Sequence, residues 1–309
     1  MTRAELERLV EQAVREVLAR MGGHDVDPAR TGDGGAGQPR GERRILVAGN
    51  WKMNPCQPDL GSYLAALAGA PTREVDTLLL PPAVLISGLR RACDAAGLRH
   101  LEVGAQDLHP EKKGAHTGEH SGALLFDAGA RHALVGHSER RQAGEGDLVV
   151  ARKILAGWDA GLSVMLCVGE SLGERKRGST FRVLRQQLML ALSGTAISPP
   201  SGHRLSVAYE PVWAIGTGER ATPAQIQEAC AFIRQVLAET YDFHLARAIR
   251  VLYGGSVTPE NALEVMSLPD VDGVLVGGAS LSGRSFGDIV AAGAKAAAGR
   301  ATARREGSP

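Results

Sequence analysis

The stretch SVMLCVGE, residues 163–170, is a continuous run of apolar residues that ends in a glycine and a carboxylate. A strand with one wet face alternates apolar and polar side chains, whereas a strand covered on both faces is apolar throughout. The run therefore predicts a buried strand of a parallel sheet. Seven similar runs lie on either side of it along the chain: ILVAGN (45–50), DTLLLPP (76–82), LEVGAQ (101–106), HALVGHS (132–138), LSVAYEP (205–211), IRVLYGGS (249–256) and GVLVGG (273–278).

Helical patterns fill the gaps between these runs. In TPAQIQEACAFIRQVLAETY (222–241), for example, Thr222 is the expected N-cap and Pro223 takes the first helical position. Eight strand and helix pairs between residues 44 and 298 predict an α/β protein with a single closed (β/α)₈ barrel, the TIM-barrel architecture. A doubly wound open sheet is the alternative, although the count of eight and the polar strand ends favour closure.

The composition is typical of one large aliphatic core. Hydrophobic residues make up 44% of the 309 residues but aromatic residues only 4%, which suits one barrel-sized domain. The net charge of +1 offers no basic excess for nucleic acid or an anionic membrane surface, so a small molecule is the expected partner. The four cysteines form no C-x-x-C pair, which disfavours a disulfide framework or a zinc knuckle and predicts a reducing, cytoplasmic setting.

The chain divides into four parts. Residues 1–22 form an expected amphipathic helix, residues 23–43 a flexible linker, residues 44–298 the barrel and residues 299–309 a disordered tail. The apolar stripe of the first part has helical spacing and consists of Leu6, Leu9, Val10, Ala13, Val14, Val17, Leu18 and Met21. Such a helix either docks on its own barrel, associates with itself or binds another protein.

Polar residues gather where the predicted strands end, and in a (β/α)₈ barrel all of these ends meet at one mouth. Taken singly, each has a structural explanation: a solvated glutamate, a hydrogen-bonded histidine, a surface pair of Lys52 with Glu139, or glycines in tight turns. Their convergence on one mouth favours a functional site. The residues are Asn50, Lys52, His137, Ser138, Glu139, Cys167, Glu170, Glu210 and the segments YGGS (253–256) and VGGAS (276–280).

The residue types at this mouth indicate a reaction class. Glycine pairs let backbone N–H groups approach an anion such as a phosphate group closely. Because no nucleotide-binding motif follows a strand, the expected ligand is a small phosphate ester and no cofactor is expected. A carboxylate, an imidazole and an ammonium beside that anchor suit proton abstraction next to a carbonyl. His116 and His120 in HTGEH have a spacing that could suggest metal ligands. They lie in a predicted loop, however, so no metal is expected there.

Five motifs resemble those of the triosephosphate isomerase family. They are AGNWKMN (48–54), GHSERR (136–141), AYEPVWAIGTG (208–218), YGGSV (253–257) and DGVLVGGASL (272–281), and they follow the family's order. The resemblance covers residues 44–298. It implies interconversion of D-glyceraldehyde 3-phosphate and dihydroxyacetone phosphate through an enediolate, without a metal or organic cofactor.

The resemblance also implies a role for each residue of the site. Glu210 would be the base that moves the proton. In this family the glutamate base acts beside a neutral histidine. His137 would polarise the substrate oxygens, Lys52 would stabilise negative charge, Asn50 would bind substrate and Glu139 would pair with Lys52. Residues 211–217 resemble the family's lid. Backbone groups at four positions would hold the phosphate: Gly216, Ser256, Gly277 and Gly278.

Two further associations are implied. Residues 114–122 resemble the loop that enters the partner subunit in the family's homodimer, with Thr117 near its tip and His116 where an aromatic residue is usual. Asp107 also stands where asparagine is frequent. Residues 1–43 resemble the encapsulation peptides of bacterial microcompartments, so residues 1–22 are expected to bind a shell or cargo protein.

Two alternative functions remain open. One is the same chemistry on a four-carbon ketose phosphate, and the other is a sugar-phosphate sensor without catalysis. The presence of Glu210, His137 and Lys52 together argues against the sensor, because binding alone needs no base.

Overall fold

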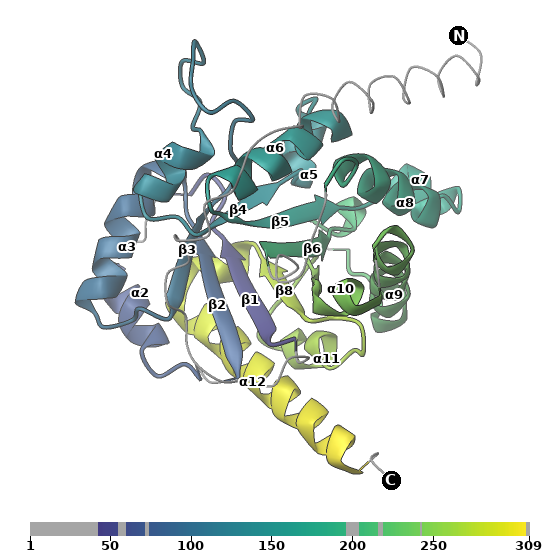
Figure 1. Ribbon diagram of the computed structural model, residues 1–309. Coiled ribbons are helices and arrows are strands. Elements are labelled where there is room, and N and C mark those ends of the chain that lie inside the picture. The colour runs from purple at the N-terminus through teal and green to yellow at the C-terminus, as the bar shows by residue number, and fades with distance from the viewer. Residues whose placement is uncertain are drawn as a thin grey trace.

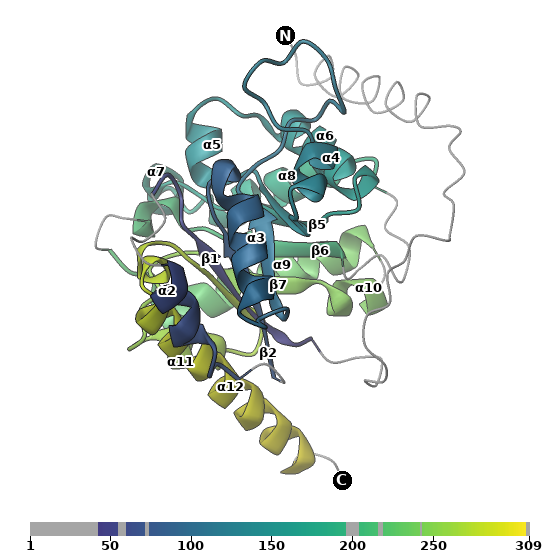
Figure 2. The same cartoon turned by 90° about the vertical axis from the view of Figure 1, so that its left-hand side faces the viewer.

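The computed structural model describes residues 43–54, 60–71, 74–195, 204–215, 219–241 and 243–306. Within these residues eight strands close into a barrel in sequence order, with the helices around it (Figures 1 and 2). The predicted (β/α)₈ barrel is therefore confirmed, and the open doubly wound sheet is excluded. The predicted N-terminal helix and almost all of the linker lie outside the described residues.

The strands are parallel throughout, and β1 closes the barrel by pairing with β8, Leu46 lying opposite Gly273. Because all strands run the same way, their carboxyl ends open at one rim. The strands are β1 (Ile45–Asn50), β2 (Val75–Leu80), β3 (Leu101–Ala105), β4 (His132–Val135), β5 (Ser163–Val168), β6 (Leu205–Tyr209), β7 (Arg250–Tyr253) and β8 (Gly273–Val276).

Helices connect successive strands and shield their outer faces. The α-helices are α2 (Leu60–Leu67), α3 (Ile86–Ala95), α4 (Gly122–Asp127), α5 (Ser138–Gln142), α6 (Asp147–Asp159), α7 (Leu172–Lys176), α8 (Thr180–Ala191), α9 (Pro223–Thr240), α10 (Phe243–Ala248), α11 (Ala262–Met266) and α12 (Gly283–Glu306). The short 3₁₀ helices are η2 (Ala83–Leu85), η4 (Val212–Ala214) and η5 (Gly278–Leu281). Among the described helices none is long and apolar enough to cross a membrane.

The start of α9 follows the sequence prediction. The Thr222 hydroxyl accepts from the Gln225 backbone N–H, and the Gln225 side chain accepts from the Thr222 N–H, which forms a capping box. Pro223 occupies the first turn, where its missing N–H leaves no helical bond unmade.

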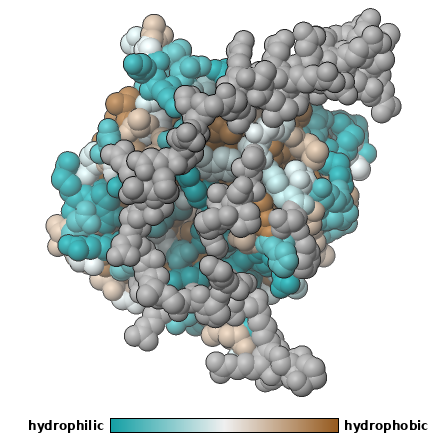
Figure 3. All heavy atoms as spheres, in the orientation of Figure 1, coloured by the Kyte–Doolittle hydropathy of each residue, from teal (hydrophilic) through white to brown (hydrophobic). Residues whose placement is uncertain are grey.

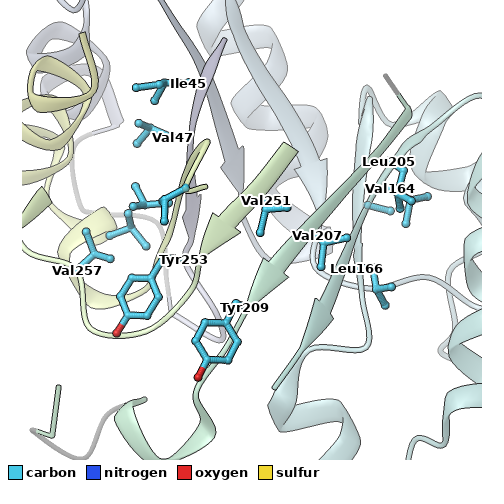
Figure 4. Packing of buried hydrophobic residues seen from close by; sticks show 14 of the residues in the cluster. Ile45, Val47, Val164, Leu166, Leu205, Val207, Tyr209, Val251, Tyr253 and Val257 are labelled. Atoms are coloured by element: carbon cyan, nitrogen blue, oxygen red, sulfur yellow. The ribbon is translucent and has the colours of Figure 1, made fainter. Parts of the chain in front are cut away.

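The core has two layers because successive residues of each strand face opposite sides. Inside the barrel lie small and aliphatic side chains such as Leu46, Ala48 and Met165. Between strands and helices lie mostly β-branched residues and leucines, among them Ile45 and Val47, and Figure 4 shows part of this layer. Burying each large aliphatic side chain contributes about 1.5–3 kcal/mol. Hydrophilic residues dominate the left and right margins of the surface in Figure 3.

The described fold extends beyond both expected domain boundaries at the opposite end of the barrel. Asp272 is fully buried and accepts from Arg43 Nε at 2.7 Å and Arg234 Nη2 at 2.6 Å, so the barrel includes Arg43. Helix α12 continues to Glu306 and projects beyond the barrel (Figure 1). Arg300 Nη2 on that helix donates to the Met266 carbonyl at 2.7 Å. The tail expected from residue 299 is therefore helical as far as Glu306.

Candidate active site

Glu210 follows β6 at the barrel mouth and is only 2% exposed. Its Oε2 accepts from the Ser138 backbone N–H at 2.9 Å, and its Oε1 lies 3.1 Å from His137 Nε2. These contacts offset the cost of burying a carboxylate. A Cβ at Gly254, after β7, would lie 2.9 Å from Glu210 Cγ, so a glycine there leaves room for the side chain. The contacts of Ser138 and Gly254 with Glu210 could not be predicted from the sequence pattern.

His137 is held in one tautomer by the turn that starts α5. Its Nδ1 accepts from the Glu139 backbone N–H at 3.2 Å, so in the neutral ring the proton is on Nε2. Nε2 is the nitrogen that faces Glu210. The imidazole can therefore donate a hydrogen bond to a substrate oxygen placed beside the carboxylate.

Lys52 and Glu139 form the pair expected from the sequence, with Lys52 Nζ 2.5 Å from Glu139 Oε1. Lys52 has a φ of 49°, the only positive value for a non-glycine residue among the described residues, a conformation that costs about 1–3 kcal/mol. Two side chains secure it. Asn50 Oδ1 accepts from the Lys52 N–H at 3.0 Å, and Gln106 Nε2 donates to the Lys52 carbonyl at 2.9 Å. Sequence reasoning missed Gln106, although it directly follows β3.

Two glycines follow β8, and the first of them lies beside Lys52. A Cβ at Gly277 would lie 3.7 Å from Lys52 Cε, while a Cβ at Gly278 would meet no described atom within 4 Å. Gly278 therefore faces open space that an anion could fill. Ser256 follows β7, and its carbonyl accepts from Asn261 Nδ2 at 3.1 Å. Gly216, the fourth expected phosphate contact, lies outside the described residues.

Glu170 anchors the segment that follows Glu210. Its Oε1 accepts from Trp213 Nε1 at 2.9 Å and from the Tyr209 hydroxyl at 3.2 Å, and it lies 3.1 Å from Arg175 Nη1. Burial, and then the charge of Glu170, raises the pKa of Tyr209 well above its usual range, so this hydroxyl stays protonated and donates. Figure 4 shows Tyr209 beside Tyr253 at the ends of β6 and β7. Sequence reasoning placed Glu170 at a strand end but missed its contact with Trp213.

Two other polar groups border the site without joining it. Burial, followed by the Glu210 charge, raises the pKa of the Cys167 thiol well above its usual value, so Cys167 is a neutral neighbour of the carboxylate. Asp107 accepts from Lys153 Nζ at 2.7 Å and pairs with Arg140, away from Glu210. In the described part of the chain no group of three or more His, Cys, Asp or Glu side chains is arranged to hold a metal ion.

Three comparisons with known proteins point to one family. The family model described as triosephosphate isomerase matches residues 45–293. The triosephosphate isomerase of Bradyrhizobium sp. (strain BTAi1) is 48% identical over 246 residues, which cover 79% of this chain and 95% of that protein. The enzyme of Moorella thermoacetica is 48% identical over 80% of this chain and 98% of its own length. The crystal structure of triosephosphate isomerase from Bartonella henselae superposes with a TM-score of 0.72 at 40% identity, covering 81% of this chain and 98% of that chain.

Proposed function

Since the chain belongs to the triosephosphate isomerase family, and so interconverts D-glyceraldehyde 3-phosphate and dihydroxyacetone phosphate, we propose that Glu210 is the base of this reaction. The observation that carries the proposal is the buried Glu210 carboxylate, 3.1 Å from His137 Nε2 at the barrel mouth. A carboxylate base beside a neutral imidazole is the arrangement for which this family is a standard case.

Each group then has one task. Glu210 takes a proton from one substrate carbon and returns it to the next. His137 donates from Nε2 to the substrate oxygens as the carbonyl moves between the two carbons. Lys52 stabilises the negative charge of the enediolate, Asn50 binds substrate, and Glu139 holds Lys52 through their 2.5 Å contact.

The phosphate group binds at the glycines that end β8. The open space at Gly278, the neighbour in the chain of Gly277 beside Lys52, supports this placement. Backbone groups of Ser256, Gly277 and Gly216 complete the anchor. Residues 211–217 act as a lid that excludes water from the enediolate. In the described structure Trp213 of this segment is held by Glu170.

Exchange of substrate hydrogen with solvent tests the role of Glu210. Wild-type protein in deuterium oxide should incorporate deuterium at the hydroxymethyl carbon of dihydroxyacetone phosphate, from which the proton is removed, whereas Glu210→Gln should show almost none. Glu264→Gln is the comparison variant, because Glu264 is an exposed glutamate on α11 with no task in the proposed site. The same assay with a four-carbon ketose phosphate shows whether the protein prefers the three-carbon or the four-carbon substrate. Exchange by Glu210→Gln at the wild-type rate would exclude Glu210 as the base.

We infer that two chains associate as a homodimer. The segment before α4 projects from the barrel (Figures 1 and 2), and residues 111–120 are all exposed. Met53 and Val84 near the barrel mouth are 96% and 86% exposed in the single chain. A second copy would cover these apolar groups, and light scattering across a dilution series measures its presence.

We also propose that the protein is cytoplasmic and that its residues 1–22 bind a shell or cargo protein of a bacterial microcompartment. These residues are dispensable for catalysis. The family model begins at residue 45, and the matched relatives are covered over 95–98% of their length while this chain is covered over 79–80%. A chain that starts at Gly41 keeps the contact between Arg43 and Asp272 and should retain activity. A fluorescent protein fused to residues 1–43 should co-localise with shells, and a diffuse signal would contradict the proposal.

A further inference from the structure

Gln187, on the outer helix α8, clamps the peptide groups of Gly169. The Gly169 N–H donates to Gln187 Oε1 at 2.8 Å, and Gln187 Nε2 donates back to the Gly169 carbonyl at 3.1 Å. An amide has one donor side and one acceptor side, so it matches a backbone N–H and C=O together. The clamp joins α8 to the residue that directly follows β5.

The clamp replaces strand pairing that has ended at this point. The register between β4 and β5 stops at Val135 opposite Leu166. On the β6 side, backbone pairing continues. The Val168 carbonyl accepts from the Glu210 N–H at 2.8 Å, and the Glu170 carbonyl accepts from the Val212 N–H at 3.1 Å. Gly169 lies between these two residues in the chain. Its N–H and carbonyl form hydrogen bonds with the Gln187 side chain on α8.

Gly169 lies directly against the backbone of Glu210. A Cβ on Gly169 would lie 1.7 Å from the Glu210 carbonyl oxygen, so the two main chains are in close contact. The next residue, Glu170, holds Trp213 of the lid segment at 2.9 Å. One clamped peptide thus lies between the backbone of the base and the anchor of the lid.

A cavity of about 300 Å³ borders the clamp. Gly169, Gln187 and Glu210 all line it, together with Ser138, Arg141 and Glu174. Because this side borders open space, packed side chains do not restrain the Gly169 peptide there. The two hydrogen bonds to Gln187 supply the restraint on that side.

We propose that Gln187 is a positioning residue for Glu210: its side-chain amide fixes the Gly169 peptide, and that peptide fixes the backbone from which the base reaches the substrate. The inference rests on the proposed role of Glu210. Gln187 lines the same cavity as Glu210, but the hydrogen bonds described for it go to Gly169 and not to Lys52, His137 or the glycines after β8. Its loss should therefore affect the chemical step and leave phosphate binding unchanged.

Gln187→Met tests the clamp because methionine has similar length but neither donor nor acceptor. A displacement of the base by about 1 Å can cost up to 10²-fold in rate, so kcat should fall by roughly 10-fold or more. The inhibition constant of inorganic phosphate should stay within about two-fold of wild type. Gln186→Met is the matched control, since Gln186 is the exposed neighbour on the same helix and should retain wild-type kcat.

Gln187→Glu supplies a signature that a purely structural role would not produce. A protonated carboxyl has one O–H donor and one C=O acceptor, as the amide does, whereas a carboxylate only accepts and would face the Gly169 carbonyl. The kcat of this variant relative to wild type should therefore rise as pH falls through the titration of the new carboxyl. Arg141, Glu174 and Glu210 line the same cavity and set where that titration occurs.

Three results would overturn the proposal. They are a Gln187→Met kcat within two-fold of wild type, a parallel loss of kcat, phosphate affinity and melting temperature, and a Gln187→Glu ratio that does not change with pH. Glu210→Asp, measured alongside, separates the two hypotheses. If that variant keeps its kcat, the role of Glu210 fails; if only Gln187→Met keeps its kcat, the clamp fails and the base stands.

Discussion

The backbone N–H of Ser138 donates to Glu210 Oε2 at 2.9 Å across 72 residues of sequence. Ser138 follows His137, so one turn after β4 holds both the imidazole and the carboxylate. The Glu210 carboxylate is thus bound to α5, while its backbone follows β6. A small change in the length of this side chain should therefore change the rate of the reaction.

Glu210→Asp should lower kcat by on the order of 10²-fold, because the shorter side chain withdraws the carboxylate by about 1 Å from a carbon that does not move. KM should change much less, since the phosphate anchor is untouched. Steady-state kinetics with inorganic phosphate as a competing ligand measure both quantities. A variant with wild-type kcat would remove Glu210 from its proposed role.

Gly278→Val should weaken phosphate binding without unfolding the barrel. The new side chain would enter space where no described atom lies within 4 Å, which is the space assigned to the phosphate. The inhibition constant of inorganic phosphate and the KM of the substrate should both rise by roughly 10-fold or more, as expected for loss of charge-assisted hydrogen bonds. Gly69→Val, which also enters open space but far from the mouth, is the control. Unchanged phosphate inhibition would place the anchor elsewhere.

Asp107→Asn should raise the melting temperature at neutral pH. Burial raises the pKa of Asp107 above its usual value, although Lys153 opposes this shift. For an acid whose pKa is higher in the folded state, the stability contribution is present below the unfolded pKa and is lost as pH rises through the folded value. The gain of the asparagine variant should therefore be largest at pH 7 and should shrink as pH falls toward 4. Thermal unfolding across this range checks the sign, and a variant less stable than wild type at pH 7 contradicts it.

Arg43→Ala should destabilise the fold by about 1–3 kcal/mol, because it removes a charged hydrogen bond from the fully buried Asp272 while Arg234 remains. The control is Arg44→Ala, whose partner Asp76 is partly exposed, so the loss should be below about 1 kcal/mol. Urea unfolding gives both values. Equal losses would show that the burial of Asp272 does not matter.

The sequence alone determined the barrel and most of its mouth. Eight continuous apolar runs predicted buried parallel strands, and the polar residues that end them, such as Glu210, His137 and Lys52, had to meet because parallel strands place their carboxyl ends at one rim. Local signals also sufficed for the start of α9, since a capping box depends on residues within one turn.

How these groups are held could not be predicted from the sequence. The contacts of Ser138 with Glu210, Gln106 with Lys52 and Gln187 with Gly169 join residues on different strands and helices, and no local pattern encodes which distant backbone group a side chain will meet. The boundaries at Arg43 and Glu306 have the same origin. Arg43 binds the buried Asp272, which directly precedes β8, and Arg300 binds a carbonyl of α11. Contacts distant in sequence thus extend the folded unit beyond the apolar runs that predicted it.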